Sequence, residues 1–312
     1  MPAREDTAAP ETGLLASPPM LAPTHPCPIC DSDTADLTMI RSDFSDADFS
    51  FRRCDTCGLV FVANPNLDLA SLYDAAYYRG DGADSFVNYL EEMGNPDTIR
   101  AYEWRGITRA VQSLCDNTAA KWLDFGCGLG GLVRYARTHG FPNVYGYDQG
   151  WGADWACEHG VDVLGEDQLR EHAGSFDVVT AIEVVEHISD PLGPMREIAS
   201  LLKPGGVFFL TTGNAAVHRD SFTSWKYVHP DLHVSYFEPR TLSEAYRRVG
   251  LEPVSAGFLP GHEDIIRYKV LRTLGGRSRN LLEGLVPWRI ASRVVDRRYQ
   301  LSEQPLARKP GR

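Results

Sequence analysis

The sequence predicts an α/β fold in which a doubly wound parallel sheet follows a small cysteine-bearing module. From residue 121 onward, short apolar runs alternate with segments whose apolar residues have helical spacing. Strands that alternate with helices are typical of βαβ units and of a parallel sheet. Ligands of such sheets bind beyond the carboxyl ends of the strands. The expected strands are 121–126, 143–148, 161–165, 176–184 and 206–213, and the expected helices are 129–138, 151–159, 191–202 and 241–250.

Composition and pattern divide the 312 residues into five segments. The first, 1–24, is rich in Ala, Pro and Thr and is expected to be a disordered tail. Residues 25–65 contain paired cysteines and are expected to form a small ribbon. Residues 66–118 show helical spacing and are expected to form a helical linker or cap. Residues 119–256 are the expected ligand-binding core, and 257–312 are an expected basic helical extension.

Charge is distributed unevenly along the chain. The formal net charge of −11 argues against broad affinity for nucleic acid. Residues 262–312 nevertheless contain 12 Lys and Arg against 5 Asp and Glu. The simplest interpretation of this basic segment is a solvated helical face. The alternative is contact with an anionic substrate or surface.

No run of 18 apolar residues occurs, so no membrane span is expected. The first residues include acidic side chains and lack the apolar core of a secretory signal. We therefore expect a cytoplasmic protein, in which the seven cysteines are thiols or metal ligands rather than disulfides. No motif in the sequence predicts an oligomeric state.

Four of the cysteines form two C-x-x-C pairs, Cys27 with Cys30 and Cys54 with Cys57. Two such knuckles can place four thiolates tetrahedrally around Zn²⁺. The 23 residues between them are slightly more than a usual ribbon has, and a longer hairpin would absorb the difference. Four ligands leave no open position, so the predicted zinc is structural.

A glycine-rich loop follows the first expected strand. Its sequence, Gly126-Cys127-Gly128-Leu129-Gly130-Gly131, fits the G-x-G-x-x-G fingerprint of dinucleotide sites and also the Asp-x-Gly-x-Gly turn of S-adenosylmethionine (SAM) enzymes. Asp148 ends the second strand, where a carboxylate can accept both ribose hydroxyls of NAD or SAM. Asp124, directly before the loop, would repel a pyrophosphate but favour the ammonium and sulfonium groups of SAM. The loop therefore favours SAM.

Four stretches of residues 100–256 together resemble the class I SAM-dependent methyltransferases: "LDFGCGLG", "YGYD", "FDVVTAIEVVEHI" and "LLKPGGVFFLTT". The resemblance implies a Rossmann-like sheet and a SAM cofactor. It leaves Glu166 and Asp167 open as adenine contacts and makes His187 a structural partner of the methionine pocket. It assigns Asp124, Gly126, Cys127 and Gly128 to the SAM loop, Asp148 to the ribose, Gln149 to the adenine and Glu183 to the methionine side.

The ribbon followed by "LYDAAYY" resembles a subgroup with an appended zinc ribbon, which includes sugar C-methyltransferases of antibiotic pathways. Ubiquinone-type O-methyltransferases share the core but not the ribbon. Those sugar enzymes carry a large third domain, whereas about 55 residues follow the core here. After the fourth strand the chain reads "IEVV" instead of [Asn/Asp]-Pro-Pro-[Tyr/Phe], which disfavours methylation of a DNA base or a glutamine nitrogen.

The acceptor side is expected after the fifth strand, in a segment dense in imidazoles and aromatic rings. Tyr227 and His233 there resemble the "Tyr…His-x-Ser-Tyr" stretch of the sugar C-methyltransferases, in which the His is the base. Histidine has a suitable unperturbed pKa for this work. His233 is the first candidate for a general base and His229 the second. A structural role for His233, with no general base at all, remains open.

Several functions compete at this stage. The leading hypothesis is a SAM-dependent methyltransferase acting on the oxygen, nitrogen or carbon of a small molecule, a sugar or natural-product intermediate. A zinc-ribbon RNA methyltransferase is the alternative, which the acidic composition disfavours. A non-catalytic SAM-fold interaction protein is a third hypothesis, against which the density of His and aromatic residues argues. An NAD-dependent dehydrogenase is disfavoured by Asp124.

Overall fold

The computed structural model describes residues 25–66, 68–85, 87–95, 97–115, 117–255, 257–273, 286–300 and 305–311. The expected tail, 1–24, lies outside these residues. Among the described helices, none combines the length and the apolar character that crossing a bilayer requires. The strands are β1 (Ala35–Arg41), β2 (Asp48–Arg53), β3 (Val60–Val62), β4 (Trp122–Phe125), β5 (Val144–Tyr147), β6 (Phe176–Ile182), β7 (Leu202–Thr211), β8 (Ser235–Tyr236), β9 (Glu252–Val254) and β10 (Leu306–Arg308). The α-helices are α1 (Leu69–Leu72), α2 (Ala75–Arg79), α3 (Tyr89–Met93), α4 (Ile99–Leu114), α5 (Gly131–Thr138), α6 (Trp151–Glu158), α7 (Glu166–Glu171), α8 (Leu192–Leu201), α9 (Pro239–Arg248), α10 (His262–Thr273) and α11 (Trp288–Tyr299), and the 3-10 helices are η1 (Val185–His187) and η2 (Ala215–Ser224).

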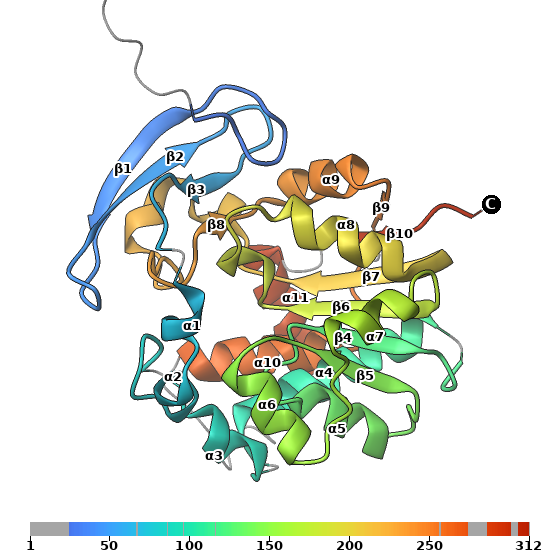
Figure 1. Cartoon of the computed structure of the whole chain (residues 1–312). Helices are drawn as coiled ribbons and strands as arrows, with labels where there is room; N and C mark the ends of the chain where they lie inside the picture. Colours follow the sequence, from blue (N-terminus) through green and yellow to red (C-terminus); the bar gives the residue numbers. More distant parts are fainter. Residues whose placement is uncertain are drawn as a thin grey trace, which may run out of the picture.

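The core is a six-stranded sheet with the order β5-β4-β6-β7-β10-β9 (Figure 1). Strands β4, β5, β6 and β7 run parallel, and β10 runs antiparallel to both of its neighbours. Helices cover both faces of this sheet. The predicted α/β fold with a doubly wound sheet is confirmed.

Two parts of the sheet differ from the sequence prediction. The strand expected at 161–165 is reduced to a single bridge between Val163 and Gly146, because the chain leaves the sheet at Gly165 to begin α7. β10, in contrast, comes from the extension that was expected to be helical. The boundary expected at residue 256 therefore divides the sheet, since β10 fills the position between β7 and β9.

Alternate side chains of the strands belong to two hydrophobic layers, one on each face. Leu123 and Phe208 pack with residues of α7, α8 and α9. Their chain neighbours Trp122 and Phe209 pack with residues of α4, α5 and α10. This period of two follows from the pleat of a strand. Because both faces are buried, the strands read as continuous apolar runs in the sequence.

A second sheet, with the order β1-β2-β3-β8, joins the N-terminal ribbon to the rest of the chain. Its last strand, β8, follows β7 in the sequence and pairs antiparallel with β3. Side chains of α9 also bind the ribbon: Arg248 donates to the Cys30 carbonyl at 3.0 Å, and Thr241 donates to the Cys57 carbonyl at 2.7 Å. The ribbon thus shares a sheet with the segment expected to meet the acceptor.

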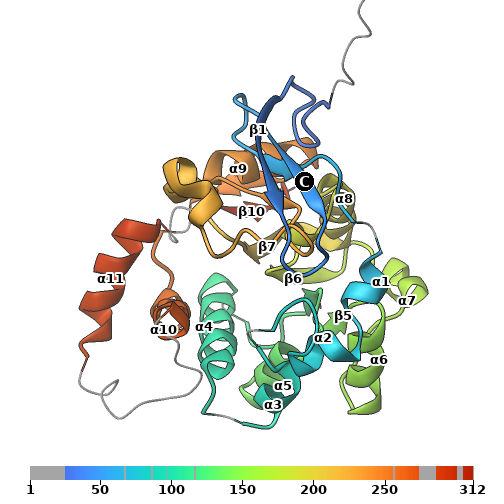
Figure 2. The same cartoon turned by 90° about the vertical axis from the view of Figure 1, so that its left-hand side faces the viewer.

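Helices α4, α10 and α11 lie side by side, with α11 outermost (Figure 2). The start of α10 approaches α4 so closely that a Cβ on Gly261 would lie 1.7 Å from the carbonyl oxygen of Gly106. Arg105 and Arg109 of α4 both form ion pairs of 2.6 Å with the buried Asp264 of α10. These contacts fix α10 against the core, and its later residues reach the carboxyl ends of the strands.

Candidate active site

The glycine loop lies between β4 and α5, at the carboxyl end of the sheet. Gly126, Gly128 and Gly130 have φ angles of 79°, 51° and 73°, in the left-handed region that glycine adopts without steric cost. The amide groups of Gly126 and Cys127 donate to the Tyr147 carbonyl at 2.7 and 3.1 Å. The loop is therefore tied to the end of β5, from which the next acidic residue extends.

Asp148, directly after β5, faces the loop. Its carboxylate accepts the N–H of Gly128 at 2.6 Å and that of Gln149 at 2.7 Å, and burial raises its pKa. The Gln149 amide donates to Glu166 at 3.1 Å. The structure thus brings Asp148, Gln149 and Glu166 together beside the loop, whereas Asp167 makes its ion pair on the exposed side of α7.

Asp124 is buried at the end of β4. Its carboxylate accepts a hydrogen bond of 2.8 Å from the Thr180 hydroxyl, and no cation in the described part of the chain pairs with it. Burial, followed by the charges of Asp148 and Glu103, raises the pKa of Asp124 to about 7. A buried carboxyl with anionic neighbours suits a ligand that brings positive charge. These residues therefore fit the ammonium and sulfonium groups of SAM.

Tyrosines from the "LYDAAYY" stretch cover this edge of the sheet. Tyr78 lies so close to α6 that a Cβ on Gly152 would be 2.2 Å from its hydroxyl. The Tyr73 hydroxyl lies 2.6 Å from Nδ1 of His187. The rings of Tyr73, Tyr77 and Tyr78 pack edge to face in sequence, with centroids 4.9 and 5.1 Å apart. The helical cap therefore contributes side chains next to the glycine loop and next to His187.

Tyr227 is at the centre of a buried polar network beyond β6 and β7. Its hydroxyl accepts the Gly213 N–H at 3.0 Å, lies 3.0 Å from the Glu183 carboxylate and contacts the Glu186 carboxyl. One hydroxyl proton can be given to only one carboxylate. Burial, and then the charge of Glu183, raises the pKa of Glu186 to about 8. Glu186 is therefore protonated at neutral pH and can donate to Tyr227, which in turn donates to Glu183.

Glu183 has an unusual backbone and a cationic partner. Its φ of 54° lies in the left-handed region, which is uncommon for residues other than glycine and often found at functional sites. Its carboxylate lies 3.6 Å from Nζ of Lys269 in α10. Burial opposes ionisation, but Lys269 and the Tyr227 hydroxyl outweigh it and lower the pKa of Glu183 to about 2. One carboxyl of the pair is thus charged and the other neutral.

The rings of His233 and His187 pack edge to face, with centroids 4.8 Å apart. Nδ1 of His233 lies 2.7 Å from the Tyr227 carbonyl oxygen, and Nδ1 of His187 lies 3.0 Å from that of Leu232. A carbonyl only accepts, so Nδ1 of His233 carries the proton and its Nε2 has a lone pair, whereas Nδ1 of His187 also contacts the Tyr73 hydroxyl, which can donate to it. Burial lowers the pKa of His233 to about 3 and that of His187 to about 4. Both imidazoles are therefore neutral at physiological pH.

His229 lies at the edge of this group, toward the ribbon. Its Nδ1 is 4.0 Å from the carboxylate of the buried Asp231, which binds the Ser42 hydroxyl in the hairpin between β1 and β2. The structure therefore brings Tyr227 and His233 together and orients His229 toward a different element.

The four paired cysteines lie together and are buried. The sulfurs of Cys27 and Cys57 are 3.5 Å apart, those of Cys30 and Cys54 are 3.4 Å apart, and all four lie within 4.8 Å of one another. Four thiolates at about 2.3 Å from a zinc ion would be about 3.8 Å apart. Each knuckle is closed by a backbone hydrogen bond from the fifth residue to the first cysteine. The cluster is compatible with a structural metal.

A second group of potential metal ligands consists of Glu186, His187 and His233, whose ligand atoms also lie within 4.8 Å of one another. Its members already bind the tyrosine hydroxyls and backbone carbonyls described above. These contacts account for the group without an ion.

Sequence reasoning did not single out Glu186, Lys269 or Tyr73. Glu186 stands three residues after Glu183 in the stretch "FDVVTAIEVVEHI". The spacing of these two acids is the sequence feature that points to Glu186 as a site residue. Tyr73 lies in a stretch that was noted only for its resemblance. Lys269 had no local signal, because its contact with Glu183 depends on how α10 packs against α4.

A family model described as a methyltransferase domain matches residues 97–256, just over half of the chain. The chain belongs to this family. It contains a SAM-dependent methyltransferase domain, and the resemblance found in its motifs is confirmed. The glycine loop, Asp148 and the polar network around Tyr227 all lie within the matched residues.

Curated and solved methyltransferases are similar to this chain over parts of their length. Ubiquinone biosynthesis O-methyltransferase of Escherichia coli is 38% identical over 104 residues, which are 30% of this chain and 43% of that enzyme. The methyltransferase therefore matches less than half the length of that relative. Phosphoethanolamine N-methyltransferase 2 of Haemonchus contortus has 16% identity and a TM-score of 0.46, over 88% of this chain and 72% of that one. Magnesium protoporphyrin IX methyltransferase of Synechocystis has 15% identity and a TM-score of 0.45, over 61% of this chain and 91% of that one.

Proposed function

We propose that this methyltransferase transfers a methyl group from SAM to a small-molecule acceptor, a sugar or natural-product intermediate. The observation that supports this most is the buried network of Tyr227, Glu183, Glu186 and His233. It lies beyond β6 and β7, and it is adjacent to Tyr73 and to the ribbon sheet. A buried network of this kind suits a compact acceptor, and the net charge of −11 disfavours a nucleic acid.

In this proposal, each residue assigned to SAM has a physical role. SAM supplies an electrophilic methyl group on a sulfonium. Gly126, Cys127 and Gly128 provide a loop without bulky side chains that the ligand can approach closely. Asp124 and Glu183 provide negative charge for the methionine end, Asp148 accepts from the ribose, and Gln149 contacts the adenine.

We propose His233 as the group that takes the acceptor's proton. As the bond from sulfur to the methyl carbon breaks and the acceptor atom bonds to that carbon, the proton passes to Nε2 of His233. The Tyr227 carbonyl holds the opposite nitrogen of the ring. A pKa of about 3 makes His233 a weak base. An oxygen that gains a methyl while keeping its proton is far more acidic than an imidazolium, so a weak base suffices for an oxygen acceptor.

The metal of the ribbon is proposed to be a single structural Zn²⁺ on Cys27, Cys30, Cys54 and Cys57. Sulfur-only ligation with four protein ligands is typical of zinc that stabilises a fold. Its contribution to catalysis would be indirect, through the pairing of β3 with β8.

Titration calorimetry of the purified full chain with SAM and with NAD is the first test, followed by measurement of S-adenosylhomocysteine release with panels of sugar-nucleotide and hydroxylated aromatic acceptors. The proposal is supported if the protein binds SAM but not NAD, and if release of S-adenosylhomocysteine depends on one class of acceptor. Release that requires tRNA or rRNA, with binding that weakens steeply as salt increases, would favour the RNA alternative. SAM binding without release on any panel would favour an interaction protein.

A further inference from the structure

The outer face of α11 presents two parallel rows of residues with a spacing of four. One row contains Arg289, Arg293 and Arg297, and the other contains Ile290 and Val294. Ile290 is 67% exposed and Val294 62% exposed, which places them among the most exposed large apolar side chains of the described residues. The face therefore combines exposed positive charge with exposed apolar surface.

The opposite face of α11 explains how the helix is held. Trp288, Ser292 and Asp296 recur with the same spacing and are buried. Arg267 of α10 lies over the Trp288 ring, 5.2 Å from its centroid. One side of α11 is thus anchored to α10, and the two exposed rows have no structural partner in that contact.

The arginine row is not explained by contacts among the residues that the structure describes. Within the described residues, none of Arg289, Arg293 and Arg297 takes part in an ion pair or a side-chain hydrogen bond. Like charges four residues apart on a helix repel each other and cost a few tenths of a kcal/mol per pair. A row that is slightly unfavourable for the isolated helix, and that has no partner among the described residues, is available to an external one.

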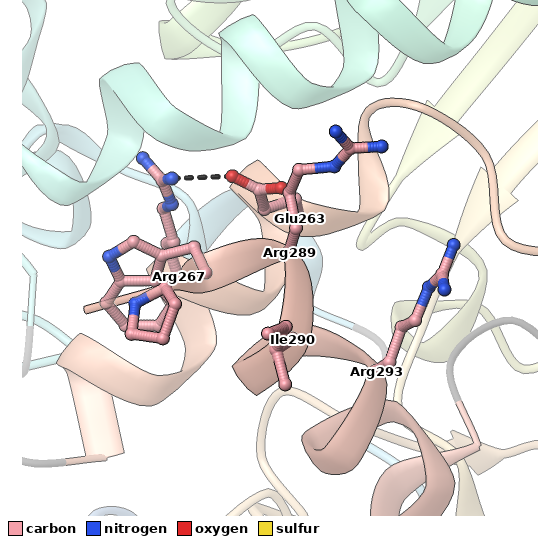
Figure 3. A pocket seen from close by; sticks show the side chains of 7 residues that line it. Glu263, Arg267, Arg289, Ile290 and Arg293 are labelled. Atoms are coloured by element: carbon pink, nitrogen blue, oxygen red, sulfur yellow. Dashed lines mark hydrogen bonds and ion pairs between the residues drawn. The ribbon is translucent and has the colours of Figure 1, made fainter.

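A groove between α10 and α11 opens on the same side. It has a volume of about 500 Å³ and is lined by Arg267, Trp288, Arg289, Ile290 and Arg293, together with Glu263 and Pro287 (Figure 3). Arg267 is paired with Glu263, which leaves Arg289 and Arg293 as the uncompensated charges of the groove. A groove with two such arginines beside an apolar wall fits a phosphate that is attached to an apolar body.

We propose that α11 docks this protein on a membrane surface that contains anionic phospholipid. The arginines would bind lipid phosphates, while Ile290 and Val294 would enter the boundary between head groups and acyl chains. A helix with basic and apolar rows is typical of interfacial membrane binding. Residues 262–312 hold a net positive charge in an otherwise acidic chain, so attraction to such a surface is confined to this region and orients the protein.

Two other occupants fit these observations less well. A nucleic acid would be met by basic and polar side chains, and large exposed aliphatic residues in line with the arginines serve no purpose there. A second copy of this chain could offer an acidic surface, but it would need an apolar patch complementary to Ile290 and Val294. The described part of the chain shows exposed large apolar residues mainly at this face and on the ribbon hairpin.

The experiment is co-sedimentation of the full chain with vesicles of phosphatidylcholine alone and with vesicles that also contain about 30% phosphatidylglycerol. We expect binding only to the anionic vesicles, and weaker binding when salt is raised from about 0.1 to about 0.5 M. The double variant R289Q/R293Q should bind about 30-fold more weakly, since each arginine contributes about fivefold. The variant I290S/V294S should also lose binding, because the apolar row is needed for insertion.

Matched controls separate this surface from general effects. Arg196→Gln removes an exposed arginine on α8, and Met39→Ser removes an exposed apolar residue on the ribbon hairpin. Both should bind anionic vesicles as the unaltered protein does. Thermal unfolding of all variants, and their SAM affinity, should be unchanged, because none of these residues contacts the glycine loop or the acceptor network.

The proposal is overturned if anionic vesicles do not bind the protein, or if R289Q/R293Q and I290S/V294S bind them normally. It is overturned also if soluble glycerol phosphate at millimolar concentration displaces the vesicles, since the groove would then recognise free phosphate. Tighter binding of tRNA than of vesicles at equal salt would assign the face to nucleic acid. Concentration-dependent dimers that both double variants abolish, without vesicle binding, would assign it to a second copy.

Discussion

The ammonium group of Lys269 lies 3.6 Å from the carboxylate of Glu183, and this contact connects α10 with the end of β6. Glu183 and Glu186 share the hydroxyl of Tyr227, so their ionisation is linked. Burial opposes the charge on both acids, and the cation decides which of them is ionised: the pKa of Glu183 is about 2 and that of Glu186 about 8. Helix α10, which lies outside the expected core, thus determines which carboxyl of the polar network around Tyr227 is charged.

Lys269→Met should impair methyl transfer most strongly at low pH. Without the ammonium, the pKa of Glu183 rises, and the carboxyl pair takes up a second proton as the pH falls. We expect activity at pH 6 to decrease by about fivefold, which requires the pKa of Glu183 to rise from about 2 to about 6.6, a shift within the range for a buried carboxyl that loses its cation. SAM affinity should also weaken at low pH, because Glu183 is assigned to the methionine end of SAM, and Lys269→Arg should restore both affinity and activity. The measurement is the pH profile of kcat/KM between pH 5.5 and 8.

A control for this variant is Lys203→Met. Lys203 forms an ion pair with Asp177 at the opposite, amino-terminal edge of the same strands. Its loss should leave the profile unchanged. A Lys269→Met enzyme whose profile matches the unaltered one at every pH would show that the cation does not control the acid pair.

The affinity for SAM should increase as the pH rises to about 7 and stay constant above it. Burial keeps Asp124 protonated below about pH 7, and a cationic ligand prefers the ionised form. Below that pH, binding must release the proton, so the affinity should change by up to about tenfold per pH unit. Calorimetry between pH 5.5 and 8.5 measures this dependence. Asp124→Asn should weaken binding and remove the dependence, whereas Asp154→Asn, an exposed change on α6, should do neither.

The same group gives a stability signature in the absence of ligand. The folded-state pKa of Asp124 is raised above its unfolded value, so the native protein holds the proton between about pH 4 and 7 while the unfolded chain releases it. The contribution of Asp124 to the free energy of unfolding therefore decreases as the pH rises through this window.

A SAM affinity that does not change with pH, or that decreases as the pH rises to 7, would contradict this account of the site.

The sequence could predict the parts of the site that are local in the chain. The glycine loop, the cysteine knuckles and the strand that ends at Asp148 each depend on residues within a few positions of one another. The position of Lys269 depends on how closely Gly106 and Gly261 approach, which no periodicity reveals. β10 was missed because its three residues are too few to form a pattern and its place between two other strands depends on tertiary pairing alone.

Purified protein should contain one Zn²⁺ per chain, and Cys54→Ser should release it. Small zinc modules draw much of their folding free energy from the ion, so the ribbon should unfold. Because β3 pairs with β8, and β8 follows His233 by two residues, kcat should decrease by at least about tenfold. SAM affinity should be retained, since the glycine loop lies on the other sheet. Elemental analysis, calorimetry and an activity assay measure the three effects.

The control for the ribbon is Cys157→Ser, which alters an exposed cysteine outside the cluster and should keep both metal and activity. Less than about half an equivalent of zinc, in protein never exposed to chelator, would speak against the metal assignment. Full activity in a metal-free Cys54→Ser enzyme would show instead that the acceptor segment keeps its shape without the ribbon.

His233→Asn should leave SAM binding intact and lower kcat by about 10²–10⁴-fold, the usual contribution of a general base. His229→Asn should have a smaller effect, since that side chain points toward Asp231 and the ribbon. The pH profile provides an independent check. An unperturbed imidazole would lose activity below about pH 6.5, but burial lowers the pKa of His233 to about 3. Protonation of His233 should therefore cause no loss of kcat between pH 5 and 7.

The two readouts distinguish a base from a structural residue. A His233→Asn enzyme with nearly unaltered kcat would reduce His233 to orienting the loop through the Tyr227 carbonyl, and catalysis would then depend on alignment and on exclusion of water. A large loss of kcat accompanied by weakened SAM binding would indicate that the loop had collapsed onto the cofactor side. A buried, neutral imidazole that takes the acceptor's proton requires two results together. His233→Asn should lower kcat without weakening SAM binding, and protonation of His233 in the unaltered enzyme should lower kcat only below pH 5.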